Sequence, residues 1–377
     1  MQAMIQRFFH PVGQGAFYSE RHLYPNINIV YDCGTGYGTK NKKGVAGVVR
    51  QSFRKDDIVH ILFISHFDFD HISLIETLKN SVNKIERVVI PLLQEREQIF
   101  LSNIYKFLGE PHLANLVSNP SEFFGGETQI ITVRSGSEQE FVERRDPIDV
   151  SEIDETGREI PSGTPLTMNN LDDWVYIPFN YKHQSRREEF LEKLNKKGVD
   201  INRLENDPNY IFNKEIRSKV KEVYKSISGC INQNSMFLYS GPSSIKDSNR
   251  FYWRGRCWHY DPCCWYFDYY VHRCDPHRVA CLYTGDGDLN KVKVKAIIYS
   301  NYWDLIGTIQ IPHHGSLSSF DASILDNRQF LCPISVGKNN YYGHPSQEVI
   351  SEILLNKSCP LLVTEDVDST FVETIEY

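Results

Sequence analysis

The hydrophobic pattern of this chain predicts short apolar strands that end in polar turns. Ile61 to Ile64 form an apolar run between polar residues, which is typical of a short buried strand. The first strands are expected as a hairpin over residues 5–34, with a glycine-rich turn between 5–10 and 27–32. Further strands are expected at residues 85–91, 175–181, 232–239, 278–283, 309–312 and 331–336. Helical spacing is expected at residues 44–58, 105–116, 186–194, 214–227 and 346–355.

The strand at 61–64 leads into a turn that holds four potential metal ligands within six positions: His66, Asp68, Asp70 and His71. The apolar spacing that follows fits the first turns of a helix, so the turn can aim several side chains at one point. Two imidazoles and two carboxylates suit zinc, manganese or iron better than calcium, which prefers oxygen ligands. Four ligands are too many for one open catalytic site that also takes ligands from elsewhere. We expect them to divide between two metals about 3.5–4 Å apart.

Three later clusters repeat this placement after a strand. Asp286 follows the strand that ends at Tyr283, with a glycine on each side, and suits a bridging ligand between two metals. His313 and His314 end the next strand, and His344 stands in a Gly-His-Pro loop before a helix. Each cluster alone is modest evidence, because such residues are also common in surface turns. Asp32 leaves two interpretations open: it orients the metal-binding turn, or it caps a turn of its own.

Composition limits the class of protein only broadly. The chain has 377 residues, 41% of them hydrophobic, and a formal net charge of −7. This charge argues against a tight, non-specific nucleic-acid coat but leaves room for a local basic groove. We found no signal core at the start and no run of about 18 apolar residues, so we expect a cytoplasmic protein without membrane spans. Nine cysteines favour free thiols or metal ligands over a disulfide framework.

Two segments fit no motif. Residues 251–277 are rich in aromatic residues, cysteines and histidines, and Cys257, Cys263, Cys274 and His277 could hold a structural zinc. The spacing matches no paired Cys-x-x-Cys knuckle, so a metal-free aromatic hairpin is the favoured interpretation, and stacking of single-stranded bases is a weaker one. Residues 92–228 carry weak signals, and their predicted helices have basic faces that are either solvated or in contact with phosphate.

The order of these clusters resembles the metallo-β-lactamase superfamily, and within it the nuclease-like domain of the ComEC-type DNA-uptake (competence) branch. The resembling pieces are residues 12–15 (Val-Gly-Gln-Gly), 31–34, 65–71, 234–235, 282–286, 312–316, 335–337, 343–346 and 362–366. The resemblance covers about residues 5–90 and 229–377. It implies a single domain over residues 1–377, with insertions at about 92–228 and 241–277, the first of which would shape substrate access.

The resemblance implies a four-layer αββα sandwich with the metals at one edge. It also implies that His66 and Asp68 bind one metal, that Asp70 and His71 bind the other, and that Asp286 bridges them. His314 would be a ligand, and His313 a ligand or a phosphate contact. The chain departs from the common pattern at Asp68, where histidine is usual, and at Ala16, where the branch has an acidic residue. The middle histidine ligand of many members is missing, and His112 and His183 are candidates by order only.

The expected function is a two-metal phosphodiesterase, most of all a nuclease acting on DNA or RNA with two divalent ions, zinc or manganese. Asp70, His313 and His344 are the expected catalytic residues. Asp70 would steer the proton of the nucleophile, His313 and His344 would stabilise the phosphoryl oxygens, and His344 would protonate the leaving oxygen. Two alternatives stay open: a hydrolase of a small phosphodiester or other small ester, and a metal-binding regulatory subunit with a protein partner in a larger complex.

Overall fold

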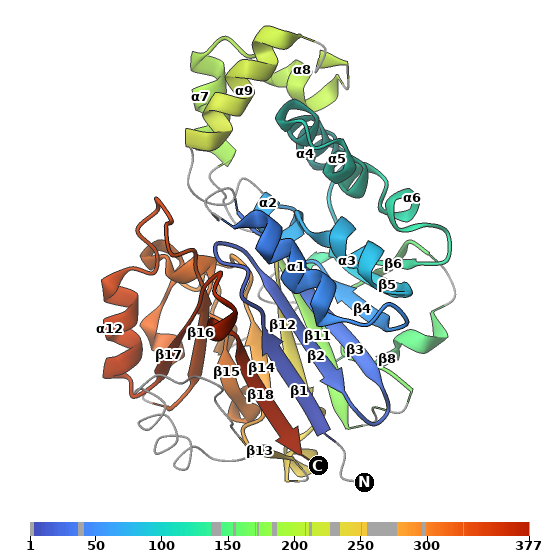
Figure 1. Ribbon diagram of the computed structural model, residues 1–377, viewed down its shortest axis with the longest axis vertical. Helices are drawn as coiled ribbons and strands as arrows, with labels where there is room; N and C mark the ends of the chain where they lie inside the picture. The colour runs from blue at the N-terminus through green and yellow to red at the C-terminus, as the bar shows by residue number, and fades with distance from the viewer. Residues whose placement is uncertain are drawn as a thin grey trace.

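Two mixed β-sheets packed face to face form the centre of the protein (Figure 1). The computed structural model describes residues 4–36, 41–136, 145–153, 156–169, 171, 173–182, 187–207, 209–210, 213–226, 234–249, 251–254, 277–295, 299–326 and 328–376. Within these residues each sheet has nine strands. The two sheets with helices on their outer faces agree with the α/β sandwich that was expected.

The first sheet has the order β13-β18-β1-β2-β3-β4-β5-β6-β9. Its strands from β13 to β3 pair antiparallel, and those from β3 to β9 pair parallel. The bounds are β1 (Met4–Phe9), β2 (Phe17–His22), β3 (Ile27–Cys33), β4 (Ile58–Phe63), β5 (Lys84–Pro91), β6 (Gln129–Val133), β9 (Arg158–Ile160), β13 (Tyr252–Arg254) and β18 (Phe371–Glu376). The parallel strands β3 and β4 end beside each other, directly before Gly34 and the ligand-rich turn.

The second sheet has the order β17-β16-β15-β14-β12-β11-β10-β8, and β7 also pairs with β11. Its strands β14 to β17 are parallel, whereas β11, β12 and β14 are antiparallel neighbours. The bounds are β7 (Ser135–Gly136), β8 (Ile148–Asp149), β10 (Leu166–Thr167), β11 (Trp174–Lys182), β12 (Asn234–Pro242), β14 (Ala280–Tyr283), β15 (Ile306–Ile309), β16 (Leu331–Ser335) and β17 (Cys359–Val363). Each of β14, β15 and β16 is followed by one of the later polar clusters.

Three hydrophobic clusters separate the layers. The middle cluster lies between the sheets and contains Phe9, Tyr31 and Phe63 of the first sheet with Tyr176 and Tyr283 of the second. The second cluster covers the outer face of the first sheet under α1 (Lys42–Ser52) and α3 (Ile75–Ser81). The third covers the outer face of the second sheet under α12 (Gln347–Leu355). The order of layers is therefore helix, sheet, sheet, helix.

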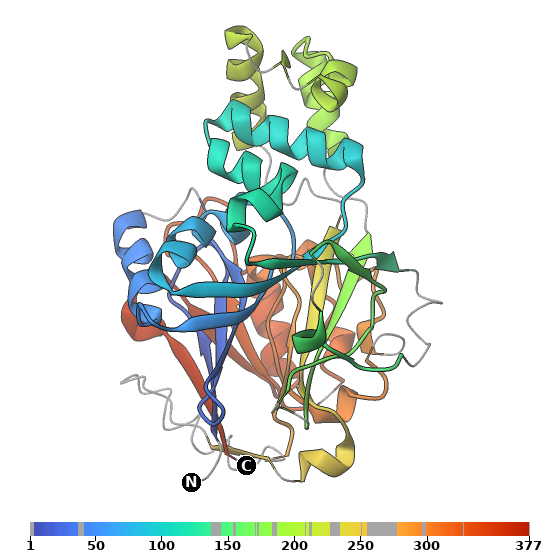
Figure 2. The ribbon, with the colours of Figure 1, turned by 90° about the vertical axis from the view of Figure 1, so that its right-hand side faces the viewer.

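A group of helices, called here the helical cap, stands at one end of the sandwich. It comprises α4 (Glu95–Leu108), α5 (Pro111–Ser118), α7 (Arg187–Lys196), α8 (Ile201–Asn206) and α9 (Lys214–Ser226). Figure 1 shows the cap above α2 (Phe69–Ile72), with the marks for both chain ends at the opposite end of the sandwich, and Figure 2 shows the cap above both sheets. Its buried residues, among them Phe100, Phe107 and Phe190, belong to the same cluster as those beneath α1 and α3.

The range 92–228, expected as one insertion, is divided between the sandwich and the cap. Its strands β6 and β9 extend the first sheet, and β7, β8, β10 and β11 belong to the second. Its helices, including α6 (Pro120–Phe124), lie outside the sheets. Only the helical part of this range is therefore separate from the sandwich, and the boundaries of an inserted segment stay a prediction.

The hairpin predicted over residues 5–34 is a three-stranded meander, because β2 lies between its two expected strands. That prediction missed β2 because its buried side chains include Ser19, Glu20 and His22, which look like surface residues in sequence. In the structure these groups find polar partners, so burial does not require an apolar side chain there.

Two further expectations concern membrane spans and the cysteine-rich segment. Among the helices that the structure describes, none is long and apolar enough to cross a bilayer. The candidate zinc ligands Cys257, Cys263 and Cys274 lie outside the described residues. His277, the fourth candidate, faces the carbonyl oxygen of Phe251 through Nδ1 at 3.2 Å.

Candidate metal centre

The candidate site lies where strand ends of both sheets meet, beside α2. His66 and Asp68 occupy the loop after β4, and Asp70 and His71 form the first turn of α2. Asp286 follows β14 in the other sheet. The backbone amide of Met236, on β12, donates to the carbonyl oxygen of Ser65 at 2.9 Å and so joins the two sheets at this edge. The polar residues come together because parallel strands end at the same edge of a sheet.

Close backbone packing holds the first turn of α2 in place. A side chain on Gly34 would bring its Cβ to 2.4 Å from the carbonyl oxygen of Asp70, and Gly15 is similarly confined at 2.9 Å. The amide of Ala16 donates to that same oxygen at 3.0 Å. Only glycine permits this approach at residues 15 and 34, which gives the Gly-rich turn and the Asp-Cys-Gly turn a structural role. These turns position Asp70 and His71 for the site.

Two overlapping groups of side chains could each hold a metal ion. One group is His66, His71 and Asp286, and the other is Asp70, His71 and His314. Within each group the ligand atoms all lie within 4.8 Å of one another. Asp68 lies beside the first group, with its carboxylate 3.9 Å from Nε2 of His66. The structure thus brings all six predicted ligands to one place, with His71 shared between the groups.

The carboxylate of Asp286 lies at the centre of this arrangement. Its Oδ1 is 3.1 Å from Nε2 of His71, and its Oδ2 is 3.7 Å from Nε2 of His66 and 3.9 Å from Nε2 of His313. Nε2 of His314 lies 3.0 Å from Oδ2 of Asp70. A carboxylate with one oxygen toward each neighbouring imidazole has the placement that a bridging ligand needs.

All four histidines at the site turn the same ring nitrogen toward it. In each ring Nε2 faces the carboxylates, and Nδ1 faces another oxygen of the protein. The oxygens near Nδ1 are Ser65 Oγ for His66 at 2.8 Å, Asp32 Oδ2 for His71 at 2.8 Å, Ser335 O for His314 at 2.8 Å and Ser319 Oγ for His313 at 3.1 Å. For His66, His71 and His314, a proton held at Nδ1 leaves the Nε2 lone pair for a cation, so this donor set fits divalent metal ions.

Asp32 orients both the turn and one of its histidines. Its Oδ1 accepts from the amide of Ser65 at 2.7 Å, and its Oδ2 accepts from the hydroxyl of Ser65 at 2.6 Å. The same Oδ2 lies 2.8 Å from Nδ1 of His71. Of the two interpretations open in the sequence, these contacts support the orienting one. Ser65, which the sequence reasoning gave no role, links Asp32 to the ring of His66.

The electrostatics of the site favour positive charge at its centre. Burial alone would raise the pKa of Asp286, but the imidazoles of His313, His71 and His66 hold that pKa well below its usual value. Burial would lower the pKa of His71, but the carboxylates of Asp286 and Asp32 raise it well above its usual value. A site that keeps carboxylates charged and attracts protons to buried imidazoles also attracts metal cations.

The turn that carries Asp286 is fixed by a buried glutamine. Oε1 of Gln310 accepts from the amides of Thr284 and Gly285 at 2.8 and 2.9 Å. The hydroxyl of Thr284 donates to the carbonyl oxygen of Gln310 at 2.7 Å. Sequence reasoning missed Gln310, although a polar residue between Ile309 and Ile311 in an apolar strand was a usable signal.

His344 belongs to a loop beside the site and is half-buried. Its ring centre lies 5.8 Å from that of His313 and 6.1 Å from that of Tyr342, which stacks on it at 20°. Asn340 holds the loop, because Oδ1 accepts from the amide of His344 at 3.0 Å and Nδ2 donates to its carbonyl oxygen at 2.7 Å. The structure therefore places His344 next to the predicted ligands, and it adds Asn340 and Tyr342 to the residues worth testing.

The structure gives no support to His112 as the missing middle ligand. His112 lies on α5 with Nδ1 3.7 Å from a carboxylate oxygen of Glu110, and it belongs to neither of the groups that could hold a metal among the described residues. His183 lies outside the described residues. His313, whose Nε2 lies 3.9 Å from Oδ2 of Asp286, is a histidine that the structure does place beside the first group.

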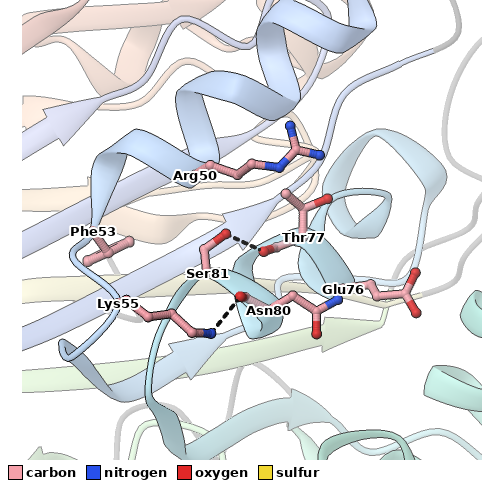
Figure 3. A pocket seen from close by; sticks show the side chains of 7 residues that line it. All are labelled: Arg50, Phe53, Lys55, Glu76, Thr77, Asn80 and Ser81. Carbon is pink, nitrogen blue, oxygen red and sulfur yellow. Dashed lines mark hydrogen bonds between the residues drawn. The ribbon is translucent and has the colours of Figure 1, made fainter.

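A hollow on the outer face of the first sheet is separate from these ligands. It has a volume of about 370 Å³ and lies between the ends of α1 and α3 (Figure 3). Its lining contains none of the predicted site residues and consists of Arg50, Phe53, Lys55, Glu76, Thr77, Asn80 and Ser81. Lys55 donates to the carbonyl oxygen of Asn80 at 2.8 Å, so one of its two basic groups is already engaged with the protein.

Comparisons with known proteins add little to this geometry. No family model matches the sequence, and no curated protein sequence matches it significantly. Among solved structures, the crystal structure of unliganded yeast PDE1 aligns over 100% of both chains, with a TM-score of 0.38 and 8% sequence identity. A likeness at this level defines neither a fold nor an activity.

Proposed function

We propose that this protein is a metal-dependent phosphodiesterase of the metallo-β-lactamase type. One observation carries the proposal: the Nε2 atoms of His66, His71 and His314 converge with the carboxylates of Asp70 and Asp286. These groups come from different strand ends of two sheets, and the opposite nitrogen of each ring faces a protein oxygen. Such an arrangement is typical of a metal site whose ligands are oriented in advance.

The chemistry of the donor set fits two divalent cations such as zinc or manganese. His66, Asp68 and Asp286 would hold one of them, and Asp70, His71, His314 and Asp286 would hold the second. Bound there, such cations would activate a water at neutral pH and offset the charge that develops on phosphoryl oxygens.

The chain itself would supply orientation and proton transfer. Asp70 contacts His314 at 3.0 Å through Oδ2, and its side chain is one-quarter exposed, so it can reach a proton on an incoming water. His313 faces Asp286 and can donate a hydrogen bond to a phosphoryl oxygen through Nε2. The ring centre of His344 lies 5.8 Å from that of His313, and an imidazole in this place is suited to protonate a leaving oxygen.

Nucleic acid is the substrate that the sequence resemblance favours, whereas the cap favours a small phosphodiester. The lysines on α7 and α9 were expected to form basic faces that are either solvated or in contact with phosphate. Several lysines on these helices, and Lys197 directly after α7, are instead paired with glutamates, namely Lys193 with Glu189, Lys196 with Glu192, Lys197 with Glu222 and Lys219 with Glu215. Charges balanced in this way do not form a continuous track for a polyanion.

One experiment tests the proposal directly. The purified protein with Mn²⁺, Zn²⁺ or Mg²⁺ is offered linear, circular and single-stranded DNA, RNA and cyclic dinucleotides. We expect metal-dependent cleavage of a phosphodiester bond in at least one of them. Metal binding without any turnover would overturn the proposal in favour of a metal-binding regulatory subunit.

Two variants separate metal binding from chemistry. Asp286→Ala removes the shared carboxylate, so we expect metal content and activity to be lost together. His344→Ala is expected to keep the metal and lose turnover by roughly 10²–10⁴-fold, the range for a general acid. Metal content by elemental analysis, melting temperature and hydrolysis are measured on both variants. Asp304→Ala, at an exposed ion pair with Arg328, is the control and should match the wild type.

Wild-type turnover in His344→Ala with metal retained would remove His344 from the mechanism. Full metal content in Asp286→Ala would show that the two groups of ligands do not share this carboxylate.

A further inference from the structure

Two tyrosines in the loop before α12 expose their rings beside the candidate metal centre. Tyr341 is 90% exposed and Tyr342 is 45% exposed. Large aromatic side chains that pack for stability are mostly buried, as Tyr18, Tyr31 and Tyr283 are in this protein. Exposed rings next to a site therefore call for a different explanation.

The loop that carries these rings is anchored at both ends, so the rings are held near the site. At its start the amide of Gly337 donates to Oε1 of Gln14 at 3.3 Å. At its end the amide of Ser346 donates to the carbonyl oxygen of Gly315 at 3.0 Å. A Cβ on Gly315 would lie 2.6 Å from Cβ of Pro345, so the loop packs tightly against the turn that carries His313 and His314.

Aromatic rings lead from the metal ligands to Tyr342 in a series. The ring centre of His314 lies 6.2 Å from that of His313, which lies 5.8 Å from that of His344. The ring of His344 in turn stacks on Tyr342 at 6.1 Å and 20°. Burial and then the nearby charge of Asp70 raise the pKa of Tyr342, which agrees with a position at the rim of the ligand cluster.

We infer that Tyr342 provides a stacking surface for the base of a nucleoside attached to the scissile phosphate. The inference rests on the proposed function, because it places the phosphate at the ligand cluster next to His313. A nucleobase lies one sugar ring away from its phosphate, and Tyr342 lies one ring beyond His344. Aromatic side chains commonly bind bases in this way, with roughly 1–3 kcal/mol per base and little sequence preference. The substrate class is therefore a nucleoside phosphodiester rather than an alkyl one.

Tyr341 precedes Tyr342 in the chain and is 90% exposed, so we assign it a second base of a strand. A nucleic-acid strand would carry a second base toward this ring, whereas a single nucleotide ester would not reach it. The two sources of a nucleoside phosphodiester, a strand and a small nucleotide, can therefore be told apart by the response to Tyr341→Ala.

The test compares two esters with the same leaving group in the metal-loaded protein: thymidine 5′-(4-nitrophenyl phosphate) and methyl 4-nitrophenyl phosphate. We expect the wild type to prefer the nucleoside ester. In Tyr342→Ala the ratio of the two kcat/KM values should fall by roughly 5–150-fold, the factor that corresponds to one stacked base. Tyr342→Phe, which keeps the ring, should restore the ratio. Calorimetric binding of thymidine 5′-monophosphate relative to methyl phosphate should change in the same direction.

Tyr252→Ala is the matched control, because Tyr252 is 49% exposed on β13, at the end of the sandwich opposite the cap (Figure 1). It should leave both esters unaffected. An unchanged ratio in Tyr342→Ala overturns the inference, while hydrolysis of neither ester by the wild type overturns the proposed function instead. With a single-stranded oligothymidylate, an additional loss in Tyr341→Ala identifies a strand as the substrate, and no additional loss identifies a small nucleotide.

Discussion

His71 is the residue on which the two groups of candidate ligands depend. Its Nε2 lies 3.1 Å from Asp286, and its Nδ1 lies 2.8 Å from Asp32. Asp32 itself has a φ of 57°, a conformation that residues other than glycine rarely adopt. This buried carboxylate therefore contacts both the ligand turn and the ring of a candidate ligand, as expected of a residue whose role is to position the site.

Replacing Asp32 with asparagine should weaken metal binding without removing a ligand. In Asp32→Asn the side-chain amide can donate to Nδ1 of His71, which then holds no proton. The ring proton moves to Nε2 and blocks the nitrogen that faces Asp286. We expect metal affinity to fall roughly 10–100-fold, the usual cost of losing such an orienting partner.

Competition with a chelator measures the affinity of Asp32→Asn. Asp247→Asn is the control, because Asp247, like Asp32, accepts hydrogen bonds from serine. Its donors are the hydroxyls of Ser243 and Ser244, at the N-terminus of α10 (Ile245–Ser248). Equal affinity in Asp32→Asn and the wild type would return Asp32 to the role of a turn cap.

The sequence indicated which residues are candidate metal ligands, but it did not indicate which residues hold those ligands in position. His66, Asp70 and Asp286 could be chosen because metal-ligand side chains follow several strands of this chain in succession. The supports Ser65 and Gln310 are ordinary polar residues whose partners lie in other strands, so their roles appear only once the strands are assembled.

Helix α4 reaches the ligand turn directly, which connects the helical cap to the site. The hydroxyl of Tyr105 donates to the carbonyl oxygen of Phe67, the residue between His66 and Asp68, at 2.5 Å. The ring of Phe67 is 1% exposed and belongs to the cluster that also contains residues of the cap. The cap thus fixes both the backbone and the side chain of one residue in the ligand turn.

Removing the hydroxyl of Tyr105 should affect the ligand turn, and with it metal binding, more than it affects the stability of the whole protein. We expect Tyr105→Phe to lower the free energy of unfolding by about 0.5–1.5 kcal/mol, as for one buried hydrogen bond, and to weaken metal binding as well. Tyr210→Phe is the matched control, since the hydroxyl of Tyr210 accepts from the amide of Asp200 at 3.0 Å within the cap. Urea unfolding and chelator competition are measured on both. Similar metal affinity in the two variants would mean that Tyr105 serves stability alone.

Whether a strand or helix could be predicted depended on where its polar residues lie in the sequence. Apolar strands such as β4 and β12 were recognisable, and so was α12 after the polar loop. The helix expected over 105–116 is two helices, because Gly109 has a φ of 89° at the end of α4 and Pro111 begins α5. The Gly-Glu-Pro sequence was a usable signal for that break.

A buried charged network joins the two sheets. Arg7 pairs with Glu20 and with Glu373, each at 2.7 Å, within the first sheet. Glu20 also accepts from hydroxyls of the second sheet, those of Ser240 at 2.7 Å and Tyr283 at 3.0 Å. Since buried charges are costly unless they are paired and hydrogen-bonded, this network restricts how the sheets can be stacked.

Two buried histidines, His22 and His10, should make the whole protein sensitive to mild acid. His22 lies between the sheets with Nε2 2.8 Å from the hydroxyl of Tyr176, and burial lowers its pKa to about 4. His10 stacks on Phe17 at 4.0 Å, and burial together with Arg21 lowers its pKa to about 3. In the unfolded chain both pKa values return to about 6.5.

The sign of the effect follows from these lowered pKa values. Above pH 6.5 both histidines are neutral in the folded and unfolded states, and their full contribution to stability is present. As the pH falls below 6.5 the unfolded chain binds protons that the folded protein does not, so stability is lost until the folded pKa is reached. Each histidine should contribute a slope of up to about 1.4 kcal/mol per pH unit in this window. The raised pKa values of His71 and His314 affect stability above pH 6.5, outside this window.

Urea unfolding of the metal-free protein at pH 5.0, 6.0 and 7.0 measures this slope. In His22→Gln, which keeps a polar group near Tyr176 but does not titrate, the loss of stability between pH 7.0 and 5.0 should be smaller than in the wild type. His112→Gln, at a partly exposed position on α5, should keep the wild-type slope. If His22→Gln and His112→Gln lose stability equally between pH 7.0 and 5.0, His22 is protonated as readily in the folded protein as in the unfolded chain. Its burial between the sheets would then not be the cause of the loss of stability in acid.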